Sequence, residues 1–135
     1  MLQIGKTPLV RLDRLTGPDC AEVWVKWEGA NPTGSMKDRM ALSMIEGGEA
    51  RGALRAGMRV VEYTGGSTGS SLAMVCAMRG YRAHFVSSNG FSDEKLRTMR
   101  AYGAEVEIIE AEGGRLTAGV IDRMIARARV LAGEP

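Results

Sequence analysis

The sequence lacks the features of membrane, secreted and nucleic-acid-binding proteins. No apolar run approaches the roughly 20 residues that a membrane helix needs. The first residues lack the basic-then-apolar plan of a signal peptide. The 18 basic residues are scattered among 16 acidic ones, and the net charge is only +2. We therefore expect neither a membrane nor a nucleic acid as a partner.

Cysteine, histidine and aromatic residues are also scarce. Cys20 and Cys76 supply neither a disulfide framework nor a metal-ligand spacing. Cys76 lies in an apolar helical pattern, which predicts a small buried side chain. The only histidine, His84, falls in a predicted strand, and we interpret it as a packed or edge residue rather than a catalyst. These features predict a reduced, cytoplasmic protein without a metal site.

What the sequence does contain is an ordinary globular composition and a regular alternation of elements. The 135 residues are 44% hydrophobic and 25% charged, which suffices for one domain with a core. From residue 58 onward, the spacing of the apolar residues predicts strands and helices that alternate along the chain: strand, helix, strand, helix, strand, helix. This order is typical of an α/β fold, a three-layer structure with a parallel sheet and helices on both faces. The predicted elements are strands at 59–63, 82–87 and 104–110, and helices at 36–47, 70–79, 92–102 and 116–131, with Gly47-Gly48 interrupting or ending the first helix.

The N-terminal part follows a different pattern. Residues 22–28 alternate, with Val23, Val25 and Trp27 on one face, and a short strand is expected between Leu9 and Leu12. No crossover helix connects these strands. We therefore divide the chain into an N-terminal strand segment, residues 1–30, and a lysine-bearing α/β domain, residues 31–135.

A lysine lies where a helix is expected to begin. Asn-Pro and Thr-Gly pairs mark a turn before it, and Ser35 is a suitable N-cap. Lys37 then falls in the first turn, where the helix dipole disfavours a cation by a few tenths of a kcal/mol. Either its side chain reaches water, with Asp38 supplying the favourable charge, or partial burial favours a neutral amine that attacks a carbonyl. Asp38 and Arg39 themselves are expected to make helix-end or surface contacts.

A glycine-rich loop lies between the first strand of the alternating region and the next helix. It reads Thr64-Gly65-Gly66-Ser67-Thr68-Gly69. Such a loop brings backbone N–H groups close to a ligand, and the helix behind it attracts an anion. The simpler interpretation is a tight strand–helix turn with an N-cap. Glu62 and Tyr63 end the preceding strand, and neither is chosen as a site residue.

Both segments resemble one enzyme family. The run Lys26-Trp27-Glu28-Gly29-Ala30-Asn31-Pro32-Thr33-Gly34-Ser35-Met36-Lys37-Asp38-Arg39 resembles the lysine motif of the fold-type II pyridoxal-phosphate enzymes, the cysteine synthase and cystathionine β-synthase group. The opening at 4–10, the glycine loop and the segment 94–106 are similar to the same family, in the same order. The resemblance implies the N-terminal half of a tryptophan synthase β-like fold.

The resemblance also implies roles for residues. Lys37 would form the Schiff base with pyridoxal 5'-phosphate and serve as the catalytic base. The loop would bind the substrate carboxylate through Thr64, Gly65, Gly66, Ser67, Thr68 and Gly69. Ser67 stands where many members have an asparagine that hydrogen-bonds the cofactor ring oxygen, and a serine hydroxyl is shorter with fewer bonding groups.

The family's enzymes are more than twice this length. Their second half carries a phosphate-binding loop and a partner for the pyridine nitrogen, and this sequence ends at Gly133-Glu134-Pro135 without either. Residues 1–30 normally pack on that second half, so their apolar side chains predict a sticky patch or self-association. A homodimer, or a need for a C-terminal half, is therefore expected.

Three functions compete on these observations. The first is a β-replacement or β-elimination on a small amino-acid substrate, O-acetylserine or serine reacting with sulfide or a thiol. The second is a non-catalytic fragment or assembly module that keeps the fold. The third is binding of another anion, such as a nucleotide phosphate, which the absence of a P-loop lysine and of a metal-ligand cluster disfavours.

Overall fold

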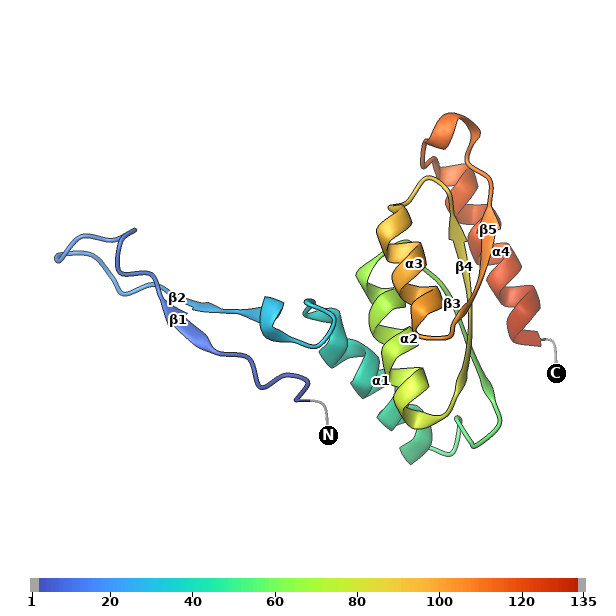
Figure 1. Ribbon diagram of the computed structural model, residues 1–135, viewed down its shortest axis with the longest axis horizontal. Coiled ribbons are helices and arrows are strands. Elements are labelled where there is room, and N and C mark those ends of the chain that lie inside the picture. Colours follow the sequence, from blue (N-terminus) through green and yellow to red (C-terminus); the bar gives the residue numbers. More distant parts are fainter. Residues whose placement is uncertain (1–2, 134–135) are drawn as a thin grey trace.

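The structure, a computed structural model, describes residues 3–133 as an α/β body with a hairpin projecting from it (Figure 1). Residues 1–2 and 134–135, the ends of the two predicted segments, lie outside the described residues. The strands are β1 Leu9–Arg11, β2 Trp24–Lys26, β3 Arg59–Tyr63, β4 Arg82–Ser88 and β5 Glu105–Ile109. The helices are α1 Lys37–Ala50, α2 Ser67–Arg79, α3 Asp93–Ala101 and α4 Ala118–Gly133, with short 3₁₀ turns at Glu28–Ala30 and Glu112–Gly114.

The body has the predicted three layers. Strands β3, β4 and β5 pair in parallel in that order, with Val60 opposite Ala83 and Phe85 opposite Val106. Helices α2 and α3 cover one face, α1 packs on α2, and α4 covers the other face (Figure 1). The fold class predicted from the alternation is therefore confirmed.

Two separate apolar clusters hold the layers together. One lies under α1–α3 and is centred on the fully buried Leu72 and Phe85. The other lies under α4 and contains Val86 and Met124. Neighbouring residues of β4 thus serve opposite faces, as the two-residue period of a strand requires.

Helix α1 extends beyond its predicted end. The Gly47-Gly48 pair was expected to interrupt or end it near residue 47, whereas the helix continues to Ala50. Gly48 is buried, and a Cβ atom there would lie 3.1 Å from the Leu54 side chain. The missing side chain lets the following turn fold closely over the helix, which explains this glycine without a helix break.

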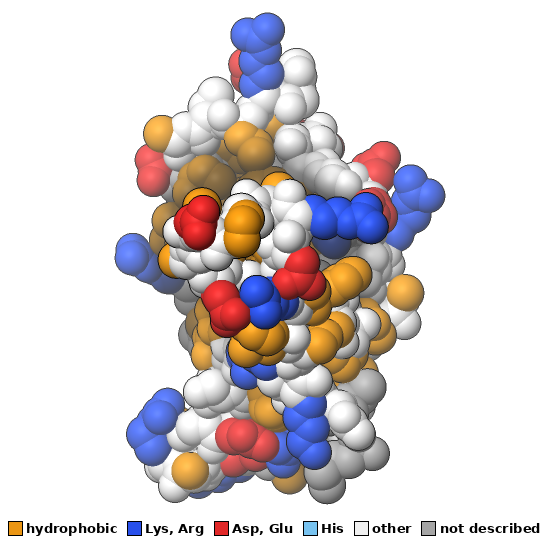
Figure 2. Space-filling model, turned by 90° about the vertical axis from the view of Figure 1, so that its left-hand side faces the viewer, with side chains coloured by type: hydrophobic (Ala, Val, Ile, Leu, Met, Phe, Trp, Pro, Cys, Tyr) orange, Lys and Arg blue, Asp and Glu red, His pale blue; other side chains and the backbone are white. Residues whose placement is uncertain are grey.

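The hairpin has almost no core of its own. Strands β1 and β2 pair antiparallel, and Leu9, Val25 and Trp27 are 59%, 41% and 59% exposed. Seen from the hairpin side, hydrophobic side chains lie at the surface among charged ones (Figure 2). An isolated two-stranded hairpin is marginal in water, so its attachment to the body matters. No helix within residues 3–133 has the length and apolarity to span a membrane.

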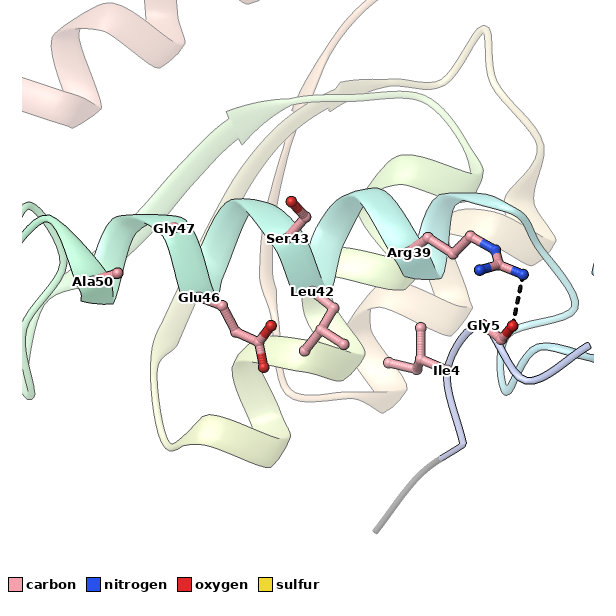
Figure 3. Close-up of a pocket in the computed structure, with 8 residues that line it drawn as sticks. All are labelled: Ile4, Gly5, Arg39, Leu42, Ser43, Glu46, Gly47 and Ala50. Carbon is pink, nitrogen blue, oxygen red and sulfur yellow. Dashed lines mark hydrogen bonds between the residues drawn. The ribbon is translucent and has the colours of Figure 1, made fainter.

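A polar latch attaches the hairpin to α1. The Arg39 guanidinium donates to both Glu28 carboxylate oxygens at 2.8 and 2.9 Å, and to the Gly5 carbonyl at 2.7 Å (Figure 3). Thr7 and Asn31 also donate to Glu28, at 2.7 and 2.9 Å. Arg39 was expected to make helix-end or surface contacts, and it does so from the first turn of α1, where its exposed guanidinium joins three chain segments.

The latch borders a surface hollow between the N-terminal segment and the outer face of α1 (Figure 3). Ile4 and Leu42 lie on its two sides, and Glu46 lies farther along the helix. None of its lining residues belongs to the glycine loop, and Lys37 does not line it. The hollow therefore lies apart from the predicted site.

The latch predicts a local acid transition. Hydrogen bonds from Arg39, then Thr7, lower the pKa of Glu28 from 4.5 to about 2. The pKa of Glu28 is lower in the folded state than in the unfolded state. The contribution of the latch to stability is therefore fully present above pH 4.5 and is lost as the pH falls toward 2. Both tryptophans, Trp24 and Trp27, lie on this hairpin segment. As the pH is lowered and the latch is lost, the hairpin becomes more mobile. Tryptophan fluorescence anisotropy should therefore fall, with a midpoint nearer pH 2 than pH 4.5.

The Glu28→Gln variant should lack that transition, because an amide neither titrates here nor matches the Arg39 fork. The matched control is Asp13→Asn, since Asp13 is an exposed carboxylate between the two hairpin strands that pairs with Arg11 instead. An unchanged anisotropy profile in Glu28→Gln would contradict the assigned role of the latch.

Candidate functional site

Lys37 is the first residue of α1 and is half-buried. The turn before it depends on Gly34, which has a φ of +74°. The Ser35 hydroxyl accepts a hydrogen bond from the Lys37 backbone N–H at 3.1 Å, but the N-cap residue of α1 is Met36, one position after the predicted Ser35. Within residues 3–133, no hydrogen bond or ion pair engages the Lys37 amine. Among these residues, the fold thus presents the lysine amine at a helix N-terminus without a partner.

The glycine loop is shorter than predicted. Helix α2 begins at Ser67, three residues before the predicted start at Ser70. The early start is supported by the buried Thr64 hydroxyl, which accepts from the Gly69 N–H at 3.0 Å. The backbone N–H of Thr64 in turn donates to the Val86 carbonyl at 2.9 Å, which fixes the loop at the end of β4. The loop proper is therefore Thr64–Gly66, and the other three predicted residues form the first turn.

Two of the glycines are required by close packing. A Cβ atom on Gly65 would lie 2.1 Å from the Phe91 ring, and one on Gly69 would lie 2.5 Å from the Thr64 methyl carbon. The first N–H groups of a helix have no acceptor within it, and Ser67 and Thr68 occupy such positions. The geometry thus keeps donors at the positive end of α2, where an anion is favoured.

A buried carboxylate joins the lysine segment to α2. Asp38 is fully buried and accepts from the Thr33 N–H at 2.8 Å, from the Thr33 hydroxyl, and from the Ser71 hydroxyl at 2.5 Å. Asp38 was expected to make a helix-end or surface contact. It makes the helix-end contact, with Thr33, but its side chain is buried and also reaches Ser71 of α2, so it does not lie at the surface. The lysine motif therefore contacts α2 directly at Ser71, two residues after the end of the glycine loop.

The remaining candidates stay outside this arrangement. His84 is buried in the central strand, 3.6 Å from the Glu105 carboxylate, so it is a packed residue and not an edge one. Burial raises the pKa of Glu62, opposed by a 2.9 Å hydrogen bond from the Tyr63 N–H. No cluster of metal-type ligands occurs among residues 3–133. Cys76 is buried as predicted, and burial raises the pKa of its thiol to about 11.

Sequence reasoning missed Ser71 and Phe91. Ser71 lies in an apolar helix where a serine has no obvious partner, and Phe91 lies in the loop after β4. Phe91 could have been found by topology, because the carboxyl ends of parallel strands meet at one edge of a sheet. Its ring closes over Gly65 from that neighbouring loop.

Comparisons with known proteins agree with this geometry. Residues 1–134 match the family described as "Pyridoxal-phosphate dependent enzyme". Cysteine synthase B of Salmonella typhimurium is 49% identical over 111 residues, covering 82% of this chain and 37% of that protein. Cysteine synthase B of Escherichia coli is 48% identical over the same shares. The chain thus spans less than two fifths of the length of these curated relatives.

Solved structures give the same result. O-ureido-L-serine synthase superimposes with a TM-score of 0.80 at 40% identity, covering 96% of this chain and 40% of that chain. A hydrogen sulfide-producing enzyme from Fusobacterium nucleatum gives a TM-score of 0.78 at 36% identity, covering 93% of this chain and 40% of that one. From the matched sequence, the shared fold and the lysine and glycine-loop geometry, we conclude that the chain belongs to the family of pyridoxal-phosphate dependent enzymes.

Proposed function

We propose that this chain is the lysine-bearing half of an enzyme of cysteine synthase type. The reaction class is replacement or elimination of the β-substituent of an amino acid, with O-acetylserine or serine as donor and sulfide or a thiol as acceptor. The proposal includes a cytoplasmic location and assembly as a homodimer or with a C-terminal half. Its support is the identity to cysteine synthases and the contact between the lysine segment and α2, the helix that follows the glycine loop.

The residues present fit the family's cofactor. The Lys37 amine, which no described residue binds, lies at a helix start and suits a group that is held through a lysine. The glycine loop leaves backbone donors at a second helix start. Lys37 would hold pyridoxal 5'-phosphate, and Ser67 would lie at its ring oxygen. When bound, this cofactor supplies an electron sink for a carbanion at the substrate α-carbon.

The chain's own residues would then divide the work. Thr64 to Gly69 would bind the substrate carboxylate through the N–H groups of the loop and of the first turn of α2. That contact orients the α-carbon of the substrate. The Lys37 Nζ would remove the α-proton as a general base and return it later. Phe91, which covers Gly65, would limit the access of water to the loop.

The observation that carries the proposal is the Asp38–Ser71 hydrogen bond. It joins residues 33 positions apart in sequence and thereby brings the lysine segment against α2, whose first turn continues the glycine loop. An amine and an anion site from distant segments are what a lysine-dependent amino-acid enzyme needs together.

A second candidate is an assembly module without activity of its own. The exposed apolar side chains of the hairpin favour it for the isolated chain. The two functions are separated by adding a chain that carries the C-terminal half of a relative. Restored sulfide-dependent cysteine formation supports a split enzyme, and tight association without turnover supports the assembly module.

Lys37 is predicted to be the residue that pyridoxal phosphate modifies. After incubation, borohydride reduction and peptide mapping, the unchanged chain should carry label at Lys37 in near-stoichiometric amount. The Lys37→Ala variant should lose the associated visible absorbance, because the remaining amines lie outside the site. A variant with undiminished absorbance would overturn the assignment.

The matched control is Lys95→Ala, since Lys95 lies on α3 beside the exposed Glu94. It should retain the full label at Lys37. Weak label spread over Lys6, Lys26 and Lys95 in the unchanged chain would favour the assembly module instead.

Ser67→Asn is predicted to strengthen cofactor retention. Ser67 is half-buried at the start of α2, and the longer amide brings a donor to the ring oxygen. One added hydrogen bond is worth about 0.5–1.5 kcal/mol, so the dissociation constant should fall roughly 2- to 10-fold. Equilibrium dialysis with pyridoxal phosphate measures this, with Ser92→Asn before α3 as the control. Weaker binding of pyridoxal phosphate by Ser67→Asn would mean that Ser67 does not lie at the ring oxygen of the cofactor.

A further inference from the structure

Asp38 is a buried carboxylate that the proposed chemistry leaves unused. Its side chain has no exposed surface, although it directly follows the lysine. Burying a carboxylate is costly unless hydrogen bonds replace its water. One oxygen accepts from the Thr33 N–H at 2.8 Å, and the other accepts from the Thr33 and Ser71 hydroxyls. The two hydroxyl oxygens lie 3.2 Å apart, so the three side chains form one closed cluster.

The cluster connects three parts of the fold. Thr33 belongs to the turn before Lys37, Asp38 to the first turn of α1, and Ser71 to α2. Hydrogen bonds are directional and apolar burial is not, so this connection specifies the relative position of α1 and α2. Within the cluster, Asp38 directly follows Lys37 in the sequence, and Ser71 lies two residues after Gly69.

We propose that Asp38 is a positioning residue that fixes the lysine turn, residues 31–37, to the first turns of α2. This inference rests on the proposed function for its purpose, since it sets the place of the Lys37 amine relative to the glycine loop. The geometry itself needs no cofactor. Mechanical coupling between the two segments can therefore be measured on the chain alone.

A local helix-capping role is the competing explanation. An acidic side chain in the first turn of α1 is favoured by the helix dipole whether or not it touches α2. A cap would affect only α1 and its preceding turn. Removing the Ser71 hydroxyl, 33 residues away, leaves the cap contacts to Thr33 in place and separates the two roles.

The first test is amide hydrogen exchange, read by mass spectrometry, on the unchanged chain and on Ser71→Ala. The expected result is at least about tenfold faster amide exchange in the lysine turn, because Ser71→Ala removes one hydrogen bond to a charged group. Exchange in β5 should stay the same. The control is Ser43→Ala, because Ser43 lies on the outer face of α1 beside the hollow (Figure 3). Unchanged exchange in the lysine turn of a folded Ser71→Ala chain would overturn the proposal.

If Ser71→Ala does not fold, the opposite end of the cluster gives the same test. Thr33→Val removes the hydroxyl at nearly constant shape, and Thr33→Ser keeps it. The Val variant should exchange faster in the first turns of α2, and the Ser variant should restore the original rate. Equal rates in the two variants would reject the coupling.

A second readout tests the purpose of the coupling. In the folded Ser71→Ala or Thr33→Val chain, the share of borohydride-trapped pyridoxal-phosphate label at Lys37 should fall relative to Lys95, and Thr33→Ser should recover it. A purely structural role would lower the unfolding midpoint without moving this ratio.

The two proposals fail separately. Faster exchange with no Lys37 label in the unchanged chain supports the coupling and rejects the proposed function. Label at Lys37 with unchanged exchange in the variants rejects the coupling and leaves the proposed function standing.

Discussion

The arrangement of this protein depends on the buried carboxylate at the start of α1. Successive side chains of a helix point about 100° apart, so three consecutive residues of the first turn of α1 point in three different directions. The Lys37 amine has no partner in the described part of the chain, Asp38 turns inward to α2, and Arg39 reaches the N-terminal segment. The inward contact fixes the helix, and the other two side chains take their directions from it. One helical turn thus determines where the amine lies and how the hairpin is attached.

Much of the body could be predicted from the sequence, because its elements are local. Short apolar runs such as Val60-Val61 predict a strand, and the helical spacing of apolar residues in α4 predicts its buried face. The parallel sheet with helices on both faces also follows from the alternation of strands and helices. The start of α2 did not follow, because the Thr64 hydroxyl stabilises an early turn through a contact that a propensity pattern does not contain. Gly48 was misjudged for a similar reason, since its close neighbour Leu54 lies outside the helix.

Only some residues of the candidate site could be predicted from the sequence. Lys37 and the glycine loop stand out because each violates a local preference or concentrates glycine. Asp38 and Ser71 do not, because an acidic residue in a first turn is ordinary and a serine in a helix is unremarkable. Their roles arise from a contact between segments 33 residues apart, and nothing in either segment alone specifies it.

The latch between the hairpin and α1 has a consequence for the order of folding. Arg39 can engage Gly5 and Glu28 only after α1 has formed and carries the guanidinium at its surface. The apolar clusters of the body, centred on Phe85 and on Met124, contain no residue of the hairpin strands. The body can therefore fold as one cooperative unit, with the hairpin as a separate unit that docks last and opens first. In the cell, this segment would be the one that chaperones and proteases meet before the rest of the chain opens.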